Sequence, residues 1–243
     1  MVEIHGIFVG LVDEPVRREA VVLRVLAEFH ARKEGAVLLA AVDAHIALIA
    51  LRVALKSVSI PIAADLKIGI GFLVNALGAM TFGPVVAIAG AAVSDTLGCL
   101  LFPSGPYFFP FIFTEIAGSL IFALFLYRAK VTTLRVTLSR FCIDFFVNIV
   151  LNTPIMWLYY QMVLGRNYAI FDAMRIVKNL VMFPIESVLL VLFLRVTIPP
   201  TYKLGYVYSD ADSLRFTKKS IIALSALTAV GIAAVALYIA YRK

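Results

Sequence analysis

The sequence is poor in charge and in the residues on which most enzymes depend. Charged side chains make up 15% of its 243 residues, against about 25% in an ordinary soluble domain. We find no HExxH, GxSxG or GxxxxGK[ST] motif, and the three histidines, His5, His30 and His45, are too scattered to form a metal-ligand cluster. The sequence therefore predicts neither an enzyme nor a bound metal or cofactor.

Hydrophobic residues, at 62%, dominate the chain instead. A bilayer core about 30 Å thick needs roughly 20 helical residues to cross it, and no long run of strict alternation indicates a β-barrel. We predict an all-α membrane protein of six helices with an additional C-terminal one. The expected spans are approximately Ala36 to Leu55, Ile68 to Phe82, Pro84 to Phe102, Phe111 to Tyr127, Val136 to Val163, Val177 to Ile198 and Ser220 to Tyr241.

The first 35 residues differ from the rest of the chain because they are charged and contain no continuous apolar run. We therefore expect no cleavable signal peptide. Val22, Leu26 and Phe29 lie on one face of a helix that Pro15 would begin and Gly35 would end. This amphipathic helix is expected at the cytoplasmic interface, although a solvated or partner-docking helix fits the pattern equally. The predicted organisation is an N-terminal segment (1–35), a six-helix membrane domain (36–198), a cytoplasmic linker (199–219) and a C-terminal transmembrane helix (220–243).

The distribution of Lys and Arg predicts the orientation in the membrane. With a cytoplasmic N-terminus, 14 of the 22 Lys and Arg residues fall on the inner side, which agrees with the positive-inside rule. Five outer cations remain unexplained by topology, namely Arg52, Lys56, Lys67, Arg175 and Lys178. Their convergence on one external mouth indicates an anionic ligand, while contact with lipid headgroups is the alternative for each.

Polar residues also follow one face of the fifth and sixth spans. In the sixth span, Arg175, Lys178, Asn179, Met182 and Glu186 share a stripe, which in a bilayer must face protein or a water-filled cavity, and Pro184 should kink the helix. In the fifth span, Arg140 and Asp144 are expected to neutralise each other. Asn148 and Asn152, followed by Trp157, are the better candidates for contacting a ligand.

The first span has two different faces. Its small-residue face carries Ala36, Ala40, Asp43, Ala44, Ala47, Ala50 and Ala54, and the opposite face carries His45, Arg52 and Lys56. If the basic face lines the cavity, the alanine face points outward, where small residues allow another helix to approach closely. We predict a membrane partner there, with packing inside a single bundle as the alternative.

A series of motifs runs along the chain from roughly Ile46 to Arg195. They are Leu66-Lys67-Ile68-Gly69-Ile70-Gly71-Phe72, Phe82-Gly83-Pro84-Val85, Asp95, Leu100-Leu101-Phe102-Pro103-Ser104-Gly105-Pro106-Tyr107-Phe108, Phe113-Thr114-Glu115, Leu124-Phe125-Leu126-Tyr127, Asn148-Ile149-Val150-Leu151-Asn152-Thr153, Arg175-Ile176-Val177-Lys178-Asn179-Leu180 and Pro184-Ile185-Glu186. Over this range the chain resembles the folate-family S components, the substrate-binding membrane subunits of energy-coupling factor (ECF) vitamin transporters.

This resemblance implies a six-helix bundle that captures a vitamin outside the cell and associates with a transmembrane coupling subunit and two ATPase subunits. It also implies that the small-residue face of the first helix contacts the coupling subunit. Three features depart from the family pattern: Lys56-Ser57-Val58 replaces Ser-Arg-Phe, Tyr107-Phe108-Phe109-Pro110-Phe111 replaces Tyr-Phe-Pro-Gly-Phe, and the chain has additional segments at both ends.

For folate or a related anionic pterin, the ring and the glutamate tail need different partners. Glu115, Asn148, Asn152 and Asn179 are candidates for the ring's donors, and Tyr107 and Trp157 for stacking. The candidates for the tail are Lys56, Lys67, Arg175 and Lys178. Glu115 fits a structural acid equally well, and Asp95 is interpreted as a helix-packing or helix-end residue. Another vitamin, a stand-alone transporter and an intramembrane enzyme remain alternatives.

Overall fold

The computed structural model describes residues 36, 39–63, 66–103, 105–166, 173–208, 214 and 218–241. The chain divides into two compact units, Met1–Ile46 and Ala47–Lys243. In the first unit, residues 36 and 39–46 are helical, and the predicted amphipathic helix of residues 1–35 lies outside the described residues. The second unit begins with helical residues 47–56 and contains every element discussed below.

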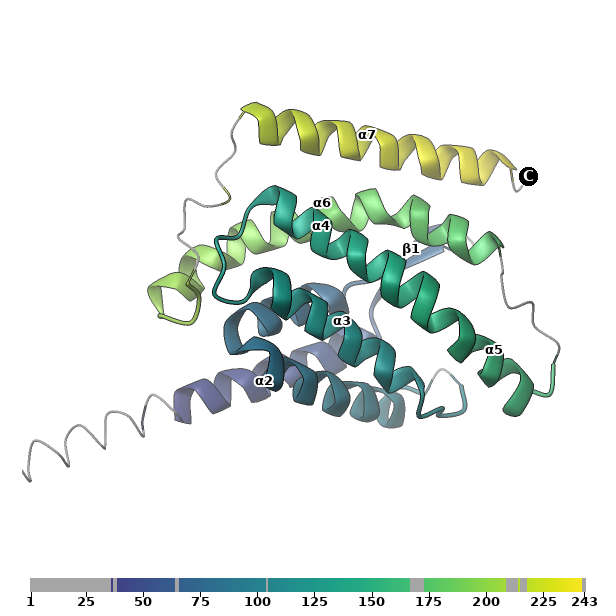
Figure 1. Cartoon of the computed structure of the whole chain (residues 1–243), viewed down its shortest axis with the longest axis horizontal. Helices are drawn as coiled ribbons and strands as arrows, with labels where there is room; N and C mark the ends of the chain where they lie inside the picture. Colours follow the sequence, from purple (N-terminus) through teal and green to yellow (C-terminus); the bar gives the residue numbers. More distant parts are fainter. Residues whose placement is uncertain are drawn as a thin grey trace, which may run out of the picture. The chain divides into compact units, whose positions relative to one another are not determined.

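The described part of the second unit consists of helices with one small hairpin (Figure 1). This architecture confirms the predicted all-α membrane fold. The elements are β1 (Ser59–Ala63), β2 (Leu66–Gly69), α2 (Gly71–Leu101), α3 (Phe111–Leu126), α4 (Thr133–Cys142), the π-helix η1 (Ile143–Leu151), α5 (Asn152–Met162), α6 (Ala173–Lys203) and α7 (Lys218–Tyr241).

Helix α2 is interrupted at the position where the sequence predicted a turn between two spans. Gly83 adopts φ 81° and ψ −179°, a conformation that residues with a Cβ rarely adopt, and Pro84 follows it. A Cβ at residue 83 would lie 2.8 Å from the ring of Tyr127. Glycine is therefore required here both by the backbone and by the close approach of the aromatic ring.

The span predicted at Val136 to Val163 is one continuous helical run formed by α4, η1 and α5. The Thr132 side chain caps its start by accepting a hydrogen bond from the Arg135 backbone N–H at 3.3 Å. The nine-residue π-helical stretch in the middle was not predicted. A π-helix turn contains more residues than an α-helix turn. Side chains four residues apart therefore lie closer to a line parallel to the helix axis than they would in an α-helix.

Strands β1 and β2 form an antiparallel hairpin that the sequence analysis did not predict. Ser59 pairs with Gly69 and Ile60 with Ile68. Pro61 pairs with Lys67 and is tolerated because a two-stranded hairpin consists only of edge strands. The hairpin leads directly into α2.

The core is built around close contact between α2 and α3. Ala76, Ala79 and Ala91 on α2 are at most 1% exposed, and Phe122 and Leu126 on α3 are 1% exposed. Small residues on one helix thus accommodate large ones on the other. The core continues onto α6 through Leu190 and Leu194, and α7 packs along α6 (Figure 1).

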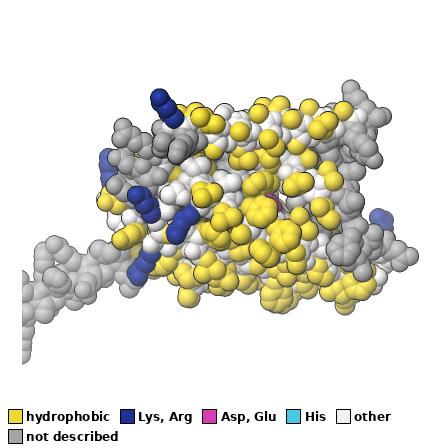
Figure 2. Space-filling model, turned by 45° about the horizontal axis from the view of Figure 1, so that its top comes forward, with side chains coloured by type: hydrophobic (Ala, Val, Ile, Leu, Met, Phe, Trp, Pro, Cys, Tyr) yellow, Lys and Arg dark blue, Asp and Glu magenta, His cyan; other side chains and the backbone are white. Residues whose placement is uncertain are grey.

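Three helical runs in the described part of the chain are long and apolar enough to cross a membrane: Gly71–Leu101, Thr133–Met162 and Ile176–Lys203. Phe111–Leu126 and Ile221–Leu237 are shorter apolar segments. Figure 2 shows a face covered largely by hydrophobic side chains, with the visible Lys and Arg toward its ends. Such a surface is suited to lipid, and we treat the chain as a multi-pass membrane protein.

Candidate functional site

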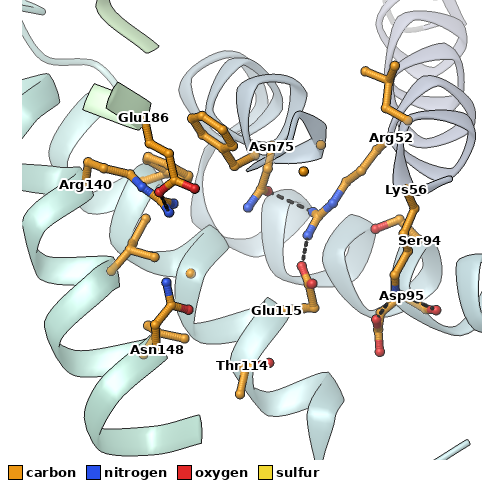
Figure 3. Close-up of a pocket in the computed structure, with 18 residues that line it drawn as sticks. Arg52, Lys56, Asn75, Ser94, Asp95, Thr114, Glu115, Arg140, Asn148 and Glu186 are labelled. Carbon is orange, nitrogen blue, oxygen red and sulfur yellow. Dashed lines mark hydrogen bonds and ion pairs between the residues drawn. The ribbon is translucent and has the colours of Figure 1, made fainter. Parts of the chain in front are cut away.

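A cavity of about 280 Å³ lies among the first helix, α2, α3, α4, η1 and α6. Figure 3 shows polar side chains that line it from these elements. They form two groups on opposite sides. We call the first group, together with Ser119, which bonds to it, the Arg52 end (Arg52, Lys56, Asn75, Asp95, Glu115 and Ser119). We call the second group, together with Asp144, which bonds to it, the Arg140 end (Arg140, Asp144, Asn148 and Glu186).

At the Arg52 end, the guanidinium has several partners from α2 and α3. Its Nη1 donates to the Asn75 side-chain oxygen at 2.8 Å and, more weakly, to Ser119 Oγ at 3.4 Å, while Nη2 forms an ion pair with Glu115. The Ser119 hydroxyl also donates to the Asn75 oxygen, at 2.7 Å. Asn75 is therefore fixed by two donors, and it fixes one edge of the guanidinium in turn.

Lys56, one helical turn further along, is turned toward α2. Its Nζ pairs with Asp95 and also donates to the Asp95 carbonyl at 3.4 Å. A Cβ at residue 98 would lie 2.5 Å from Lys56 Cδ, so the lysine stem passes over α2 where Gly98 leaves room. Asp95 was interpreted from the sequence as a helix-packing or helix-end residue, whereas here it is the counter-ion of a cation lining the cavity.

At the Arg140 end, one guanidinium is shared by two carboxylates. Arg140 pairs with Asp144 at 2.9 Å, as the four-residue spacing predicted, and also with Glu186 from α6. Asn148 donates to Asp144 at 2.8 Å, and the Phe72 ring centroid lies 4.7 Å from the Arg140 guanidinium carbon. These charges are deeply buried, and because removing an ion from water costs several kcal/mol, their mutual pairing is required.

Charges in the described lining are balanced. Three cations, Arg52, Lys56 and Arg140, face three carboxylates, Asp95, Glu115 and Glu186. The excess of positive charge expected at an external mouth is therefore not carried by these lining residues. An anionic ligand entering this cavity meets cations that already have partners.

The structure brings four of the predicted ligand contacts to the cavity: Arg52, Lys56, Glu115 and Asn148. Five other predicted contacts are among the described residues but do not line the cavity: Tyr107, Asn152, Trp157, Lys178 and Asn179. Tyr107 is 48% exposed, and the other four are partly buried. The side chains of Lys67 and Arg175 lie outside the described residues.

Sequence reasoning missed several lining residues, chiefly Asn75, Asp95 and Thr114 as ligand candidates. It placed Arg140 in a structural pair, and Glu186 on a polar stripe without a ligand role. An isolated polar residue in a hydrophobic span is a signal for such positions, and Asn75 within Ile70–Met80 is an example.

The alanine face of the first helix was predicted to dock a partner. In the first unit, Ala36, Ala40 and Asp43 are exposed, and Ala44 is partly buried. In the second unit, Ala47, Ala50 and Ala54 are exposed, while Arg52 points into the cavity (Figure 3). Within the second unit, the alanines and the cavity cation therefore occupy different faces.

The apolar helices and the cavity between them define a membrane protein with an internal polar cavity. No protein-family model matches the sequence. Over 125 residues, the chain is 37% identical to "Folate transporter FolT" of Clostridium novyi, covering 51% of this chain and 70% of the relative. It is 30% identical, again over 125 residues, to "Folate transporter FolT" of Leuconostoc mesenteroides, covering 50% and 66%.

A solved structure described as FolT bound with folic acid matches with a TM-score of 0.52 and 30% identity. The match covers 61% of this chain and 87% of the other. The chain belongs to the family of FolT folate transporters. This finding confirms the predicted resemblance to folate-family S components and the prediction that the chain is not an enzyme, since its relatives are named transporters.

Proposed function

We propose that this chain is the substrate-binding subunit of an ECF-type vitamin transporter, which captures folate or a related anionic pterin outside the cell and delivers it inward. The relatives named folate transporters and the related structure bound with folic acid support this proposal. The observation that carries it in this chain is a polar cavity with one buried end and one more exposed end.

The Arg140 end is suited to the pterin ring. Glu186 and Asn148 line the cavity there, and a carboxylate and an amide can accept from the adjacent N–H donors of a pterin. The side chains of Arg140, Asp144 and Glu186 are between 7% and 12% exposed, so a ring bound there is largely shielded from water. Burial strengthens hydrogen bonds that discriminate between heterocycles.

The Arg52 end is suited to the negatively charged tail. The Lys56 and Glu115 side chains are 35% and 38% exposed, so this end is the wetter one. A cavity of about 280 Å³ lies at the small end of ligand pockets, which span roughly 300–1,000 Å³. The ring therefore fills the cavity, and the tail extends past Arg52 and Lys56.

The remaining predicted contacts belong to the entrance in this proposal. Cations there attract the tail before it reaches Arg52, and aromatic and amide groups guide the ring. These entrance residues are Lys67, Tyr107, Asn152, Trp157, Arg175, Lys178 and Asn179.

In this proposal the energy for transport comes from other chains, which is consistent with the lack of a GxxxxGK[ST] motif in this sequence. We propose a transmembrane coupling subunit docked on the alanine face of the first helix, with two ATPase subunits attached to it and the N-terminus of this chain in the cytoplasm. Exposed alanines permit the close helix contact that such docking needs.

A direct test is to purify the full chain in detergent and measure the binding of folate and of riboflavin by calorimetry, with mass spectrometry of any co-purified molecule. We expect folate to bind and riboflavin not to bind. A co-purified flavin, or no folate binding, would overturn the assignment of the ligand.

Docking is tested separately by co-expression with coupling and ATPase subunits of a folate transporter. We predict that Ala50→Leu together with Ala54→Leu abolishes co-purification without changing folate affinity, because larger side chains keep the partner helix away. Ala233→Leu, at an exposed position of α7, is the matched control and should still co-purify. Unchanged co-purification of the double variant would contradict the docking face.

A further inference from the structure

Arg52 pairs with Glu115 and Lys56 pairs with Asp95, but the two ion pairs differ in how easily the carboxylate can dissociate. Glu115 is 38% exposed and extends from α3 toward Arg52 on a flexible stem. Asp95 is 5% exposed, has a shorter side chain and holds Lys56 against α2 over Gly98. Releasing Glu115 returns a carboxylate to water, whereas releasing Asp95 leaves a buried charge unpaired.

Arg52 itself does not depend on Glu115 for its position. Its Nη1 is held by the Asn75 oxygen at 2.8 Å, and Asn75 is fixed in turn by the Ser119 hydroxyl at 2.7 Å. Glu115 pairs with the other nitrogen, Nη2. If Glu115 swings away, the guanidinium stays in place with Nη2 available to another carboxylate.

We propose that Glu115 is an exchangeable counter-ion of Arg52, which a carboxylate of the incoming ligand displaces, so that Glu115 sets the affinity of the site for anions. This inference rests on the proposed function, because it requires a ligand with a carboxylate at the Arg52 end. In this role Glu115 competes with the ligand carboxylate for Arg52. The sequence had instead offered Glu115 as a hydrogen-bond acceptor for the pterin ring.

These two roles predict opposite effects of one substitution. Glu115→Gln removes the competing charge and keeps the size and an accepting oxygen of the side chain. We expect it to bind folate on the order of fivefold more tightly, since a partly exposed ion pair no longer has to be broken. 6-Methylpterin, which has the ring without the tail, should bind the variant and the parent chain equally.

Salt dependence separates exchange from simple repulsion. If one ion pair replaces another, folate affinity of the parent chain changes little between low and high salt, and the affinity of Glu115→Gln falls as salt rises. If Glu115 only repels the ligand through space, added salt tightens folate binding to the parent chain. Glu115→Asp, which keeps the charge, is the control and should show no gain in affinity.

The full-length chain and both variants are titrated with folate and 6-methylpterin by calorimetry at two salt concentrations. Tighter folate binding by Glu115→Gln alone, with the expected salt dependence, supports the exchange. Three results would overturn it. Glu115→Gln binds folate more weakly than the parent chain, or it binds folate and 6-methylpterin more tightly by the same factor, or the parent chain binds folate more tightly at high salt. If the parent chain binds no folate, the proposed function falls and the inference with it.

Discussion

The Arg52 end and the Arg140 end use the same chemistry, a guanidinium with carboxylate partners, in different surroundings. The Arg140 end is buried. Its one cation pairs with Asp144 from the same helical run and with Glu186 from α6. The Arg52 end is partly open, and Glu115 reaches water. Burial makes the three charges Arg140, Asp144 and Glu186 a structural unit that cannot lose a member, whereas exposure leaves the Arg52 end able to change partners.

The largest effect that this comparison predicts is on stability at the Arg140 end. Arg140→Ala leaves Asp144 and Glu186 facing each other without a cation, and we expect a loss of about 3–5 kcal/mol in folding free energy. The melting temperature in detergent measures it. Arg135→Ala, an exposed arginine of the same helix, is the control and should melt like the parent. Equal melting of both variants would mean that the buried pairs do not stabilise the fold.

At the Arg52 end, we predict an effect on the ligand with a smaller effect on stability. Arg52→Ala should weaken folate binding about tenfold to a hundredfold, because a hydrogen bond to a charged group contributes roughly 1.5–3 kcal/mol. Binding of 6-methylpterin should not change, and Arg52→Lys should recover part of the affinity for folate. A loss for both ligands would indicate that Arg52 contacts the ring, which would remove the distinction between the ends.

The smallest effect is expected at Asn148, which belongs to the buried end but lines the cavity. Asn148→Ala should weaken folate and 6-methylpterin by the same factor, on the order of fivefold, since one neutral hydrogen bond to the ring is lost. Gln161→Ala, an exposed amide on α5, serves as the control. If only folate binding weakens, the tail and not the ring lies at this end.

Features encoded by local sequence were predictable. Gly83 and Pro84 predicted the break within α2, because only glycine tolerates that backbone and proline cannot continue the preceding helix. The four-residue spacing of Arg140 and Asp144 predicted their ion pair. The long hydrophobic runs predicted the helical membrane fold.

Features that depend on which helices meet were not predictable from one sequence. Spacing within a helix gives no information on the approach of Glu186 to Arg140, since they come from different helices. The same holds for Asn75 with Arg52 and for Asp95 with Lys56. The π-helix of η1 also escaped detection, because its composition does not differ from that of an ordinary apolar helix.

The contact between α6 and α7 connects a remote part of the chain to the cavity. Gly231 of α7 lies against Pro184 and Ile185, and a Cβ at residue 231 would be 3.0 Å from the Ile185 side chain. Glu186 follows immediately and lines the cavity. Ile232 is 65% exposed beside that contact, so a fluorophore attached there would sit one helix away from Glu186 without replacing any residue that lines the cavity.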